Sequence, residues 1–248
     1  MKAGRRAAVL AVMLAAVVLV ARLPTAWIVA EPGRALPLQA VAPRSDSGGE
    51  AGQDGSRGTY LLVTVGVRTA RGADVMAGLL RRDRALWPRS VLGTGDPEAV
   101  ARAQRQALLA SQREAVAAAA RLLGREAVPE LRFHLPAEFG GPSGGLAFAL
   151  AAVDALSPGD LSAGLRVAAT GTVRADGSVG PVAGTALKEV AAARAGADVF
   201  FVPRGTVAGG AAGSGSGGSP QRVEVSHLRE AVRWLCLHGG QSPACAGF

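Results

Sequence analysis

One serine of the chain has the surroundings of a catalytic nucleophile. Ser143 lies in the glycine-rich string GGPSGG at residues 140–145, directly before an apolar segment with helical spacing. The flanking glycines allow the backbone to adopt angles that other residues avoid. The helix that follows directs its N-terminal amides and the positive end of its dipole at any group above the serine. This setting suits a nucleophile whose reaction creates an oxyanion, although a helix-capping serine in a Pro-Ser-Gly turn has the same pattern.

A lysine stands out because the chain almost never uses one. Of its 27 basic residues only Lys2 and Lys188 are lysines, and the rest are arginines. Arginine cannot release its proton in a protein, whereas burial among apolar neighbours lowers the pKa of a lysine and lets it act as a general base. Together Ser143 and Lys188 predict a Ser-Lys hydrolytic dyad. A lysine solvated at the surface is the alternative interpretation of Lys188.

The string GPSGG also fits the G-x-S-x-G turn of Ser-His-Asp hydrolases. Candidates for the other two members of such a triad follow in the required chain order: Asp176 or Asp198, then His227 or His238. That turn needs a strand running straight into the serine, but PAEFGG separates Ser143 from the predicted strand at 131–135. The histidine triad is therefore the less favoured alternative. We expect His134, within that strand, to be packed or solvent-facing.

Composition excludes several classes of protein. The chain has 248 residues with 49% hydrophobic content, enough for a substantial core. Its net charge is +8, but no basic run is interleaved with aromatics, which make up only 4%, so nucleic-acid binding is not expected. With two cysteines and three histidines, no ordinary Cys/His zinc site forms, and no GxxxxGK[ST] phosphate loop occurs. We expect an enzyme with no metal, no cofactor and no ATPase module of its own.

The N-terminus has the pattern of an export signal. Residues 7–21 are uninterrupted apolar sequence behind a positive cluster, and after Arg22 the apolar character continues to Ala30. Counted through Ala30, the segment is long enough to cross about 30 Å of hydrocarbon. We therefore predict a signal anchor at 1–30, with a cleaved signal peptide as the alternative. The positive flank places the rest of the chain outside the cytoplasm, at the cell membrane.

The two cysteines support this location. An exported chain meets an oxidising environment, in which Cys236 and Cys245 are expected to form a disulfide near the C-terminus. Two free thiols would follow if the domain stayed in a reducing compartment.

The remaining chain is predicted to form one mixed α/β (α+β) domain at 59–248 behind a flexible tether at 31–58. Tyr60 to Val67 has the apolar, β-branched character of a strand covered on both faces. Asp96 and Pro97 begin a long helix that reaches Leu123, with a break possible near Ser111. Strands and helices then alternate: strands at 131–135, 165–173, 198–202 and 222–225, helices at 146–156, 186–195 and 228–237, and a low-complexity loop at 205–219.

Two blocks of this domain resemble the proteolytic domain of Lon proteases, which are Ser-Lys peptidases. GPSGGLAFALAAVDAL is similar to the nucleophile motif and its helix, and VAATGTVRADGSVGPVAGTALKEVAAARAGADVFFVP to the block that carries the lysine, which aligns on Lys188. The resemblance covers about 130–240, which it marks as the catalytic core. It implies that Thr170 orients the Lys188 amine and that the domain forms hexamers. The N-terminal anchor and the strand at Tyr60 resemble the small membrane-anchored Lon-like proteases that usually carry a PDZ domain.

The chain departs from those relatives in two ways. Gly144 occupies the position of Ala in the family motif GPSAG, which lowers helix propensity by roughly 1 kcal/mol but keeps a small residue beside the nucleophile. Only REAVPE separates the long helix from the strand at 131, where the anchored relatives insert a PDZ domain. Recruitment of substrates through a PDZ domain is therefore not implied for this chain.

These features together predict an ATP-independent, membrane-anchored serine endopeptidase that acts on polypeptides outside the cytoplasm. Ser143 would attack the scissile carbonyl, Lys188 would take and return the proton, and the backbone amides of Ser143 and Gly144 would stabilise the oxyanion. The alternative from another class is a non-catalytic, membrane-tethered scaffold or binding module that keeps the Lon-like fold.

Overall fold

The fold is organised around one twisted sheet. The computed structural model describes residues 2–41, 58–78, 84–93, 95–207 and 218–247. Its six-stranded sheet has the order β10-β9-β6-β3-β1-β4. Four strands run parallel, namely β3 (Thr59–Arg71), β6 (Arg166–Ala169), β9 (Val199–Pro203) and β10 (Gln221–Val225), whereas β1 (Pro24–Leu38) and β4 (Ala85–Pro88) are antiparallel to their neighbours. The predicted mixed α/β class is confirmed.

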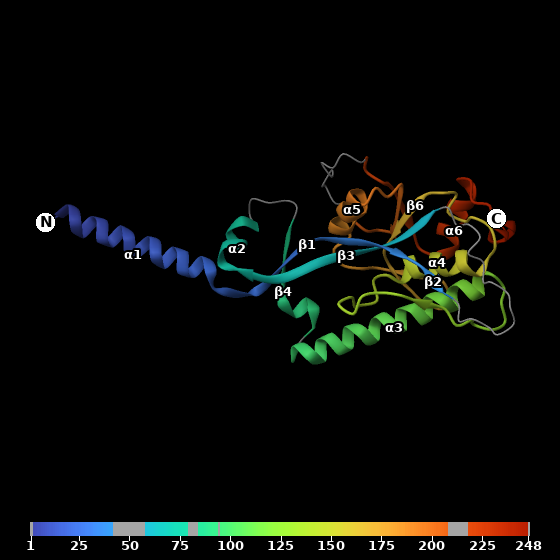
Figure 1. Ribbon diagram of the computed structural model, residues 1–248, viewed down its shortest axis with the longest axis horizontal. Helices are drawn as coiled ribbons and strands as arrows, with labels where there is room; N and C mark the ends of the chain where they lie inside the picture. The colour runs from blue at the N-terminus through green and yellow to red at the C-terminus, as the bar shows by residue number, and fades with distance from the viewer. Residues whose placement is uncertain (1, 42–57, 79–83, 94, 208–217, 248) are drawn as a thin grey trace.

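Helices cover both faces of this sheet, and the strand side chains alternate accordingly. On one face α3 (Pro97–Leu122), α4 (Gly145–Leu156) and α6 (Leu228–Leu237) form the larger core with Tyr60, Leu62, Val167, Val199 and Phe201. On the other face α5 (Thr185–Arg194) packs over Leu61, Val63, Ala168, Phe200 and Val202. Figure 1 shows α5 on the side of the sheet opposite to α3 and α4. The first half of the strand predicted at Tyr60 to Val67 is therefore covered on both faces, while Val67 is exposed.

The long helix α3 is continuous. Its first residue is Pro97, and the carboxylate of Asp96 caps it by accepting a hydrogen bond from the Ala99 amide at 3.3 Å. Gly124, with a φ of +65°, lies just beyond its C-terminal end. The break considered near Ser111 is absent, since Ser111 lies buried within the helix.

The N-terminal segment differs from the prediction. Helix α1 (Lys2–Arg22) ends before the apolar run does, and β1 begins at Pro24. Proline disfavours helix in the residue before it, and the β-branched residues that follow favour a strand. Ile28, Val29 and Ala30 are buried in the sheet, so the prediction of one anchor segment reaching Ala30 is wrong.

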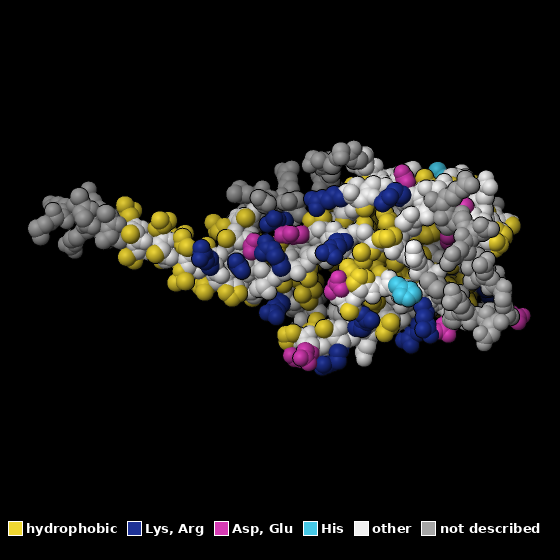
Figure 2. All heavy atoms as spheres, viewed as in Figure 1, with side chains coloured by type: hydrophobic (Ala, Val, Ile, Leu, Met, Phe, Trp, Pro, Cys, Tyr) yellow, Lys and Arg dark blue, Asp and Glu magenta, His cyan; other side chains and the backbone are white. Residues whose placement is uncertain are grey.

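Apolar side chains of α1 lie at the surface, as Figure 2 shows. Leu10, Met13 and Val17 are 60–66% exposed. Among the residues whose structure is described, no helix meets the length and apolarity needed to span a membrane.

The tether predicted at 31–58 is also wrong in its first part. Residues 31–38 belong to β1, and β2 (Ala40–Val41) pairs with β5 (Arg132–Phe133). Residues 42–57 lie outside the described residues, as do 208–217 of the predicted low-complexity loop. The ribbon of β1 and β3 connects the body of the domain to α2 (Gly72–Gly78) and α1 (Figure 1).

Two predicted strands are shorter than expected. Only Arg132–Phe133 forms a strand in the segment 131–135. The strand predicted at 165–173 divides into β6 and β7 (Thr172–Val173), because Gly171 has a φ of +145° and interrupts the extended chain. β7 pairs instead with β8 (Val179–Gly180). The interruption leaves Thr170 and Gly171 at the end of the central strand β6.

A disulfide links the C-terminal segment to α6. Cys236, within α6, is joined to Cys245, within the short helix η2 (Pro243–Gly247), by the predicted disulfide. The α6 boundaries Leu228 and Leu237 agree with the prediction.

Candidate active site

Ser143 lies in the turn that leads into α4. Gly144 is the N-cap residue, and the Gly145 amide donates to the Pro142 carbonyl at 3.3 Å. Helix α4 itself is almost wholly buried, since its residues from Gly145 to Val153 are all in the core. Ser143 is only half-buried and lies just before the amino end of this buried helix.

Helix α3 holds this turn from the side. The Ser111 hydroxyl donates to the Pro142 carbonyl at 3.0 Å, and the Gln104 carbonyl accepts from the Gly141 amide at 2.8 Å. Glu114, further along α3, accepts from the Ala175 amide at 2.6 Å. Sequence reasoning missed these roles. A serine in an alanine-rich helical segment is the available signal, but from the sequence it indicates only a possible break near Ser111.

Lys188 lies in α5 with only 3% of its surface exposed. Burial lowers the pKa of its amine from 10.5 to about 8, because removal of water disfavours the charged form. The alternative of a solvated surface lysine is therefore wrong. An amine with this pKa is partly neutral near pH 8 and can accept a proton there.

Thr170 connects Lys188 to the serine turn. Its hydroxyl accepts a hydrogen bond from Nζ of Lys188 at 3.0 Å and donates to the Ser143 carbonyl at 3.2 Å. The Gly171 amide donates to the same carbonyl at 2.9 Å. Thr170 is fully buried. The structure thus brings together Ser143, Thr170 and Lys188, three residues that the sequence predicted, although no hydrogen bond joins Nζ of Lys188 to the Ser143 hydroxyl in the described part of the chain.

Glu189, the carboxylate next to Lys188, is directed elsewhere. It forms an ion pair with Arg222 of β10 at 3.6 Å. Neighbouring residues of a helix do not share a face, and burial alone accounts for the lowered pKa of Lys188. Glu189 therefore does not oppose the lowering of the Lys188 pKa.

The two amides predicted to form the oxyanion hole are those of Ser143 and Gly144. Within the described ranges, neither amide donates a hydrogen bond to a protein acceptor. Both lie at the amino end of α4, where the helix dipole favours negative charge. An oxyanion at this position would meet two amides that no described protein acceptor occupies.

A Cβ would meet different neighbours at Gly144 and at Gly145, the two glycines after Ser143. A Cβ on Gly145 would lie 2.6 Å from the Val173 amide nitrogen and 3.1 Å from the Gly171 carbonyl oxygen, so no side chain fits against this backbone. A Cβ on Gly144 would lie 2.4 Å from Cδ1 of Leu62, the movable end of a side chain. Leu62 thus occupies the space that an alanine would need.

The histidines have other partners. Nε2 of His227 is 2.9 Å from the Asp176 carbonyl oxygen, and Nδ1 accepts from the Arg229 amide at 3.1 Å, which caps α6. The ring of His238 stacks on Trp234 with centroids 3.6 Å apart. His134 is exposed. Among the described residues, no histidine is hydrogen-bonded to Ser143, and the geometry gives the Ser-His-Asp alternative no support.

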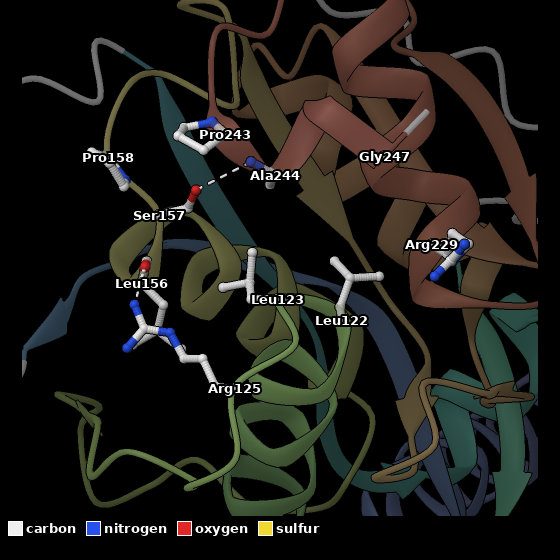
Figure 3. Close-up of a pocket in the computed structure, with 10 residues that line it drawn as sticks. All are labelled: Leu122, Leu123, Arg125, Leu156, Ser157, Pro158, Arg229, Pro243, Ala244 and Gly247. Atoms are coloured by element: carbon white, nitrogen blue, oxygen red, sulfur yellow. Dashed lines mark hydrogen bonds between the residues drawn. The ribbon is translucent and has the colours of Figure 1, made fainter.

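A cavity of about 320 Å³ lies at the other end of α4. Residues from the ends of α3 and α4, the start of α6 and η2 line it, as Figure 3 shows. Ser157 stands at its wall and accepts from the Ala244 amide at 3.3 Å. This cavity does not include Ser143, Thr170 or Lys188. In the described parts of the chain, no group of three or more His, Cys, Asp or Glu side chains is placed to hold a metal ion.

Comparison with models of known protein families finds no match for the chain, and comparison with curated proteins finds none either. The resemblance to Lon proteases therefore rests on the two sequence motifs.

Proposed function

We propose that this protein is an ATP-independent serine endopeptidase with a Ser-Lys dyad. One observation carries the proposal: the buried Lys188 amine, with its pKa lowered to about 8, is hydrogen-bonded to Thr170, which in turn is hydrogen-bonded to the main chain of Ser143. A buried lysine without an acidic partner is costly for a fold, and a general base explains why it is kept. The Lon-like sequence motifs give the same assignment.

The proposed reaction gives each of these groups one role. The Ser143 hydroxyl attacks the carbonyl carbon of the scissile peptide bond, and its proton passes to the neutral Lys188 amine. The oxygen of the tetrahedral intermediate receives hydrogen bonds from the Ser143 and Gly144 amides. When the carbon–nitrogen bond breaks, Lys188 returns the proton to the leaving amine. Water then hydrolyses the acyl-enzyme with Lys188 again as the base. The proposed reaction uses no metal, nucleotide or other cofactor.

The substrate class is polypeptide. Ser143 is half-buried at the end of a helix, and exposed, unstructured segments suit such a site better than folded proteins do. Hexamer formation is part of the same proposal and rests on the Lon resemblance only.

We also propose that the domain acts outside the cytoplasm and stays at the cell membrane through the N-terminal segment. The positive cluster before the apolar run and the disulfide of Cys236 with Cys245 support export. Thiol alkylation of protein from its native membrane, before and after reduction, tests this. Two thiols that react without reduction would contradict it.

The proposed activity is tested with a fluorophosphonate probe and with fluorescein-labelled casein. Wild-type protein should be labelled at Ser143 and should hydrolyse casein. Ser143→Ala and Lys188→Arg should each lose both reactions, because arginine keeps the charge but cannot act as a base. Lys188→Met shows whether the fold survives loss of the amine.

Ser90→Ala is the matched serine control, since Ser90 is exposed and lies in η1 (Arg89–Leu92), outside the site. It should retain full activity. A wild-type protein that neither labels nor hydrolyses would instead favour the non-catalytic scaffold, and activity retained in Lys188→Arg would exclude the dyad.

A further inference from the structure

The two peptide groups on either side of Ser143 are each fixed through the carbonyl. The Pro142 carbonyl accepts from the Ser111 hydroxyl at 3.0 Å and from the Gly145 amide at 3.3 Å. The Ser143 carbonyl accepts from the Gly171 amide at 2.9 Å and from the Thr170 hydroxyl at 3.2 Å. Each carbonyl oxygen therefore uses both of its lone pairs on protein donors.

Because a trans peptide group is planar, the hydrogen bonds that hold its carbonyl also fix the direction of its amide. Within one peptide group the N–H points away from the C=O, and the described chain has no cis peptide bond. The donors to the Pro142 carbonyl therefore fix the direction of the Ser143 amide, and the donors to the Ser143 carbonyl fix that of the Gly144 amide. Because the carbonyls are held from inside the domain, the two amides face away from those donors, and no described protein acceptor takes them.

We propose that Ser111 is a positioning residue that orients the Ser143 amide as an oxyanion donor. This inference rests on the proposed peptidase function, in which that amide binds the oxyanion. Ser111 is only 5% exposed and comes from α3, so a long, well-anchored helix supplies the hydroxyl. Without it, the Pro142 carbonyl keeps only the longer hydrogen bond from Gly145, which belongs to the same turn and moves with it.

Ser111 acts on one part of the site only. Its hydrogen bond goes to Pro142 and involves neither Thr170 nor Lys188. The base keeps its burial and its hydrogen bond when Ser111 is changed. Loss of the hydroxyl should therefore slow the chemical step while leaving the ionisation of the base in place, a combination that general destabilisation does not produce.

The test measures how fast an alkyl fluorophosphonate modifies Ser143, followed by intact mass over a range of pH. In this reaction Ser143 Oγ bonds to phosphorus, fluoride leaves, the serine proton passes to Lys188, and the phosphoryl oxygen takes the place of the oxyanion. Loss of one oxyanion donor typically costs about 10²- to 10³-fold, so a donor that is only misdirected should cost about 10- to 100-fold. We expect Ser111→Ala to lower the rate by that factor with an unchanged apparent pKa.

Ser157→Ala is the matched control. Ser157 is also a buried, hydrogen-bonded serine, 6% exposed, but it lies at the opposite end of α4. It should lose comparable stability and keep the wild-type labelling rate per folded molecule. Thermal unfolding of both variants supplies the folded fraction.

The outcomes separate the two proposals. If wild-type protein labels at Ser143 and Ser111→Ala labels within about twofold of it, the positioning role is wrong and the peptidase proposal stands. If Ser111→Ala shifts the apparent pKa together with the rate, Ser111 acts on the base and the inference is also wrong. If wild-type Ser143 is not modified at all, the peptidase proposal fails and this inference fails with it.

Discussion

Thr170 and Lys188 come from different elements, yet the Thr170 hydroxyl is the hydrogen-bond acceptor of the Lys188 amine, at 3.0 Å. Thr170 follows β6, and Lys188 lies one turn into α5 on the opposite face of the sheet from α4. The same hydroxyl donates to the Ser143 carbonyl at the start of α4. Thr170, at the end of the central strand β6, therefore joins the helix that carries the predicted base to the turn that carries the predicted nucleophile.

The first prediction concerns this link. Thr170→Val removes the hydroxyl and should lower kcat/KM for casein by about 10- to 100-fold, because the Lys188 amine loses the hydrogen bond that holds it in position. It also removes an acceptor that favours the charged amine, so the apparent pKa should move to lower pH. Thr170→Ser keeps the hydroxyl and should stay close to wild type. A Thr170→Val enzyme with wild-type rates would show that the link has no catalytic role.

The second prediction is the pH dependence of activity. Burial places the pKa of Lys188 at about 8, and only the neutral amine can accept the serine proton. We expect kcat/KM to rise about tenfold per pH unit below pH 8 and to level off above it. His134→Gln, His227→Gln and His238→Gln, tested one at a time, should keep this profile. If one of them loses both the ionisation and the activity while remaining folded, a histidine is the base.

The third prediction is the pH dependence of stability. The pKa of Lys188 is lowered from 10.5 to about 8, so between these values the unfolded chain binds more protons than the folded chain. The free energy of unfolding contributed by Lys188 should rise with pH from about 8 to 10.5, by about 3 kcal/mol, and stay constant below that window. Urea denaturation of wild-type protein and Lys188→Met across this window measures the difference. A constant difference between the two proteins would show that the amine is not buried in solution.

The fourth prediction separates Gly144 from Gly145. Gly145→Ala forces a Cβ against the backbone of Gly171 and Val173 and should cost about 2–3 kcal/mol of stability, with loss of labelling at Ser143. A Cβ in Gly144→Ala would meet side chains only, Cδ1 of Leu62 at 2.4 Å and the ring of Phe148 at 3.1 Å. Because these atoms can shift, and because alanine is a poorer N-cap than glycine, the change should cost about 1 kcal/mol. Denaturant unfolding of the two variants gives both values. Equal costs would contradict the packing described here.

Much of the domain follows from local sequence patterns. Short apolar runs predict the strands at Tyr60 and Val199, and the cap at Asp96 with Gly124 defines α3 within a residue or two. The strand β1 was missed because Pro32, Gly33 and Pro37 are typical of a loop. Its pairing with β3 stabilises an extended chain that no local signal predicts.

The candidate site, like the fold, is predictable from the sequence only in part. Ser143 and Lys188 are recognisable from residue types alone, since one has glycine neighbours and the other is a rare lysine. The role of Ser111 depends on a contact with Pro142 across 31 residues of sequence, and nothing near Ser111 indicates that partner. Residues that act through such distant contacts become visible only when the fold is known.

The number of residues in helix α3 between Gln104 and Ser111 determines the direction in which the Ser111 hydroxyl points. Gln104 and Ser111 are seven residues apart, so they lie on nearly the same side of the helix, and Glu114 follows less than one turn later. Each residue added to or removed from the helix rotates everything beyond it by about 100°. A single deletion between Gln104 and Ser111 would therefore turn the Ser111 hydroxyl away from Pro142 while Gly141 stays bound. We expect substitutions on the exposed side of α3 to be tolerated, but its length between these two contacts is fixed by geometry.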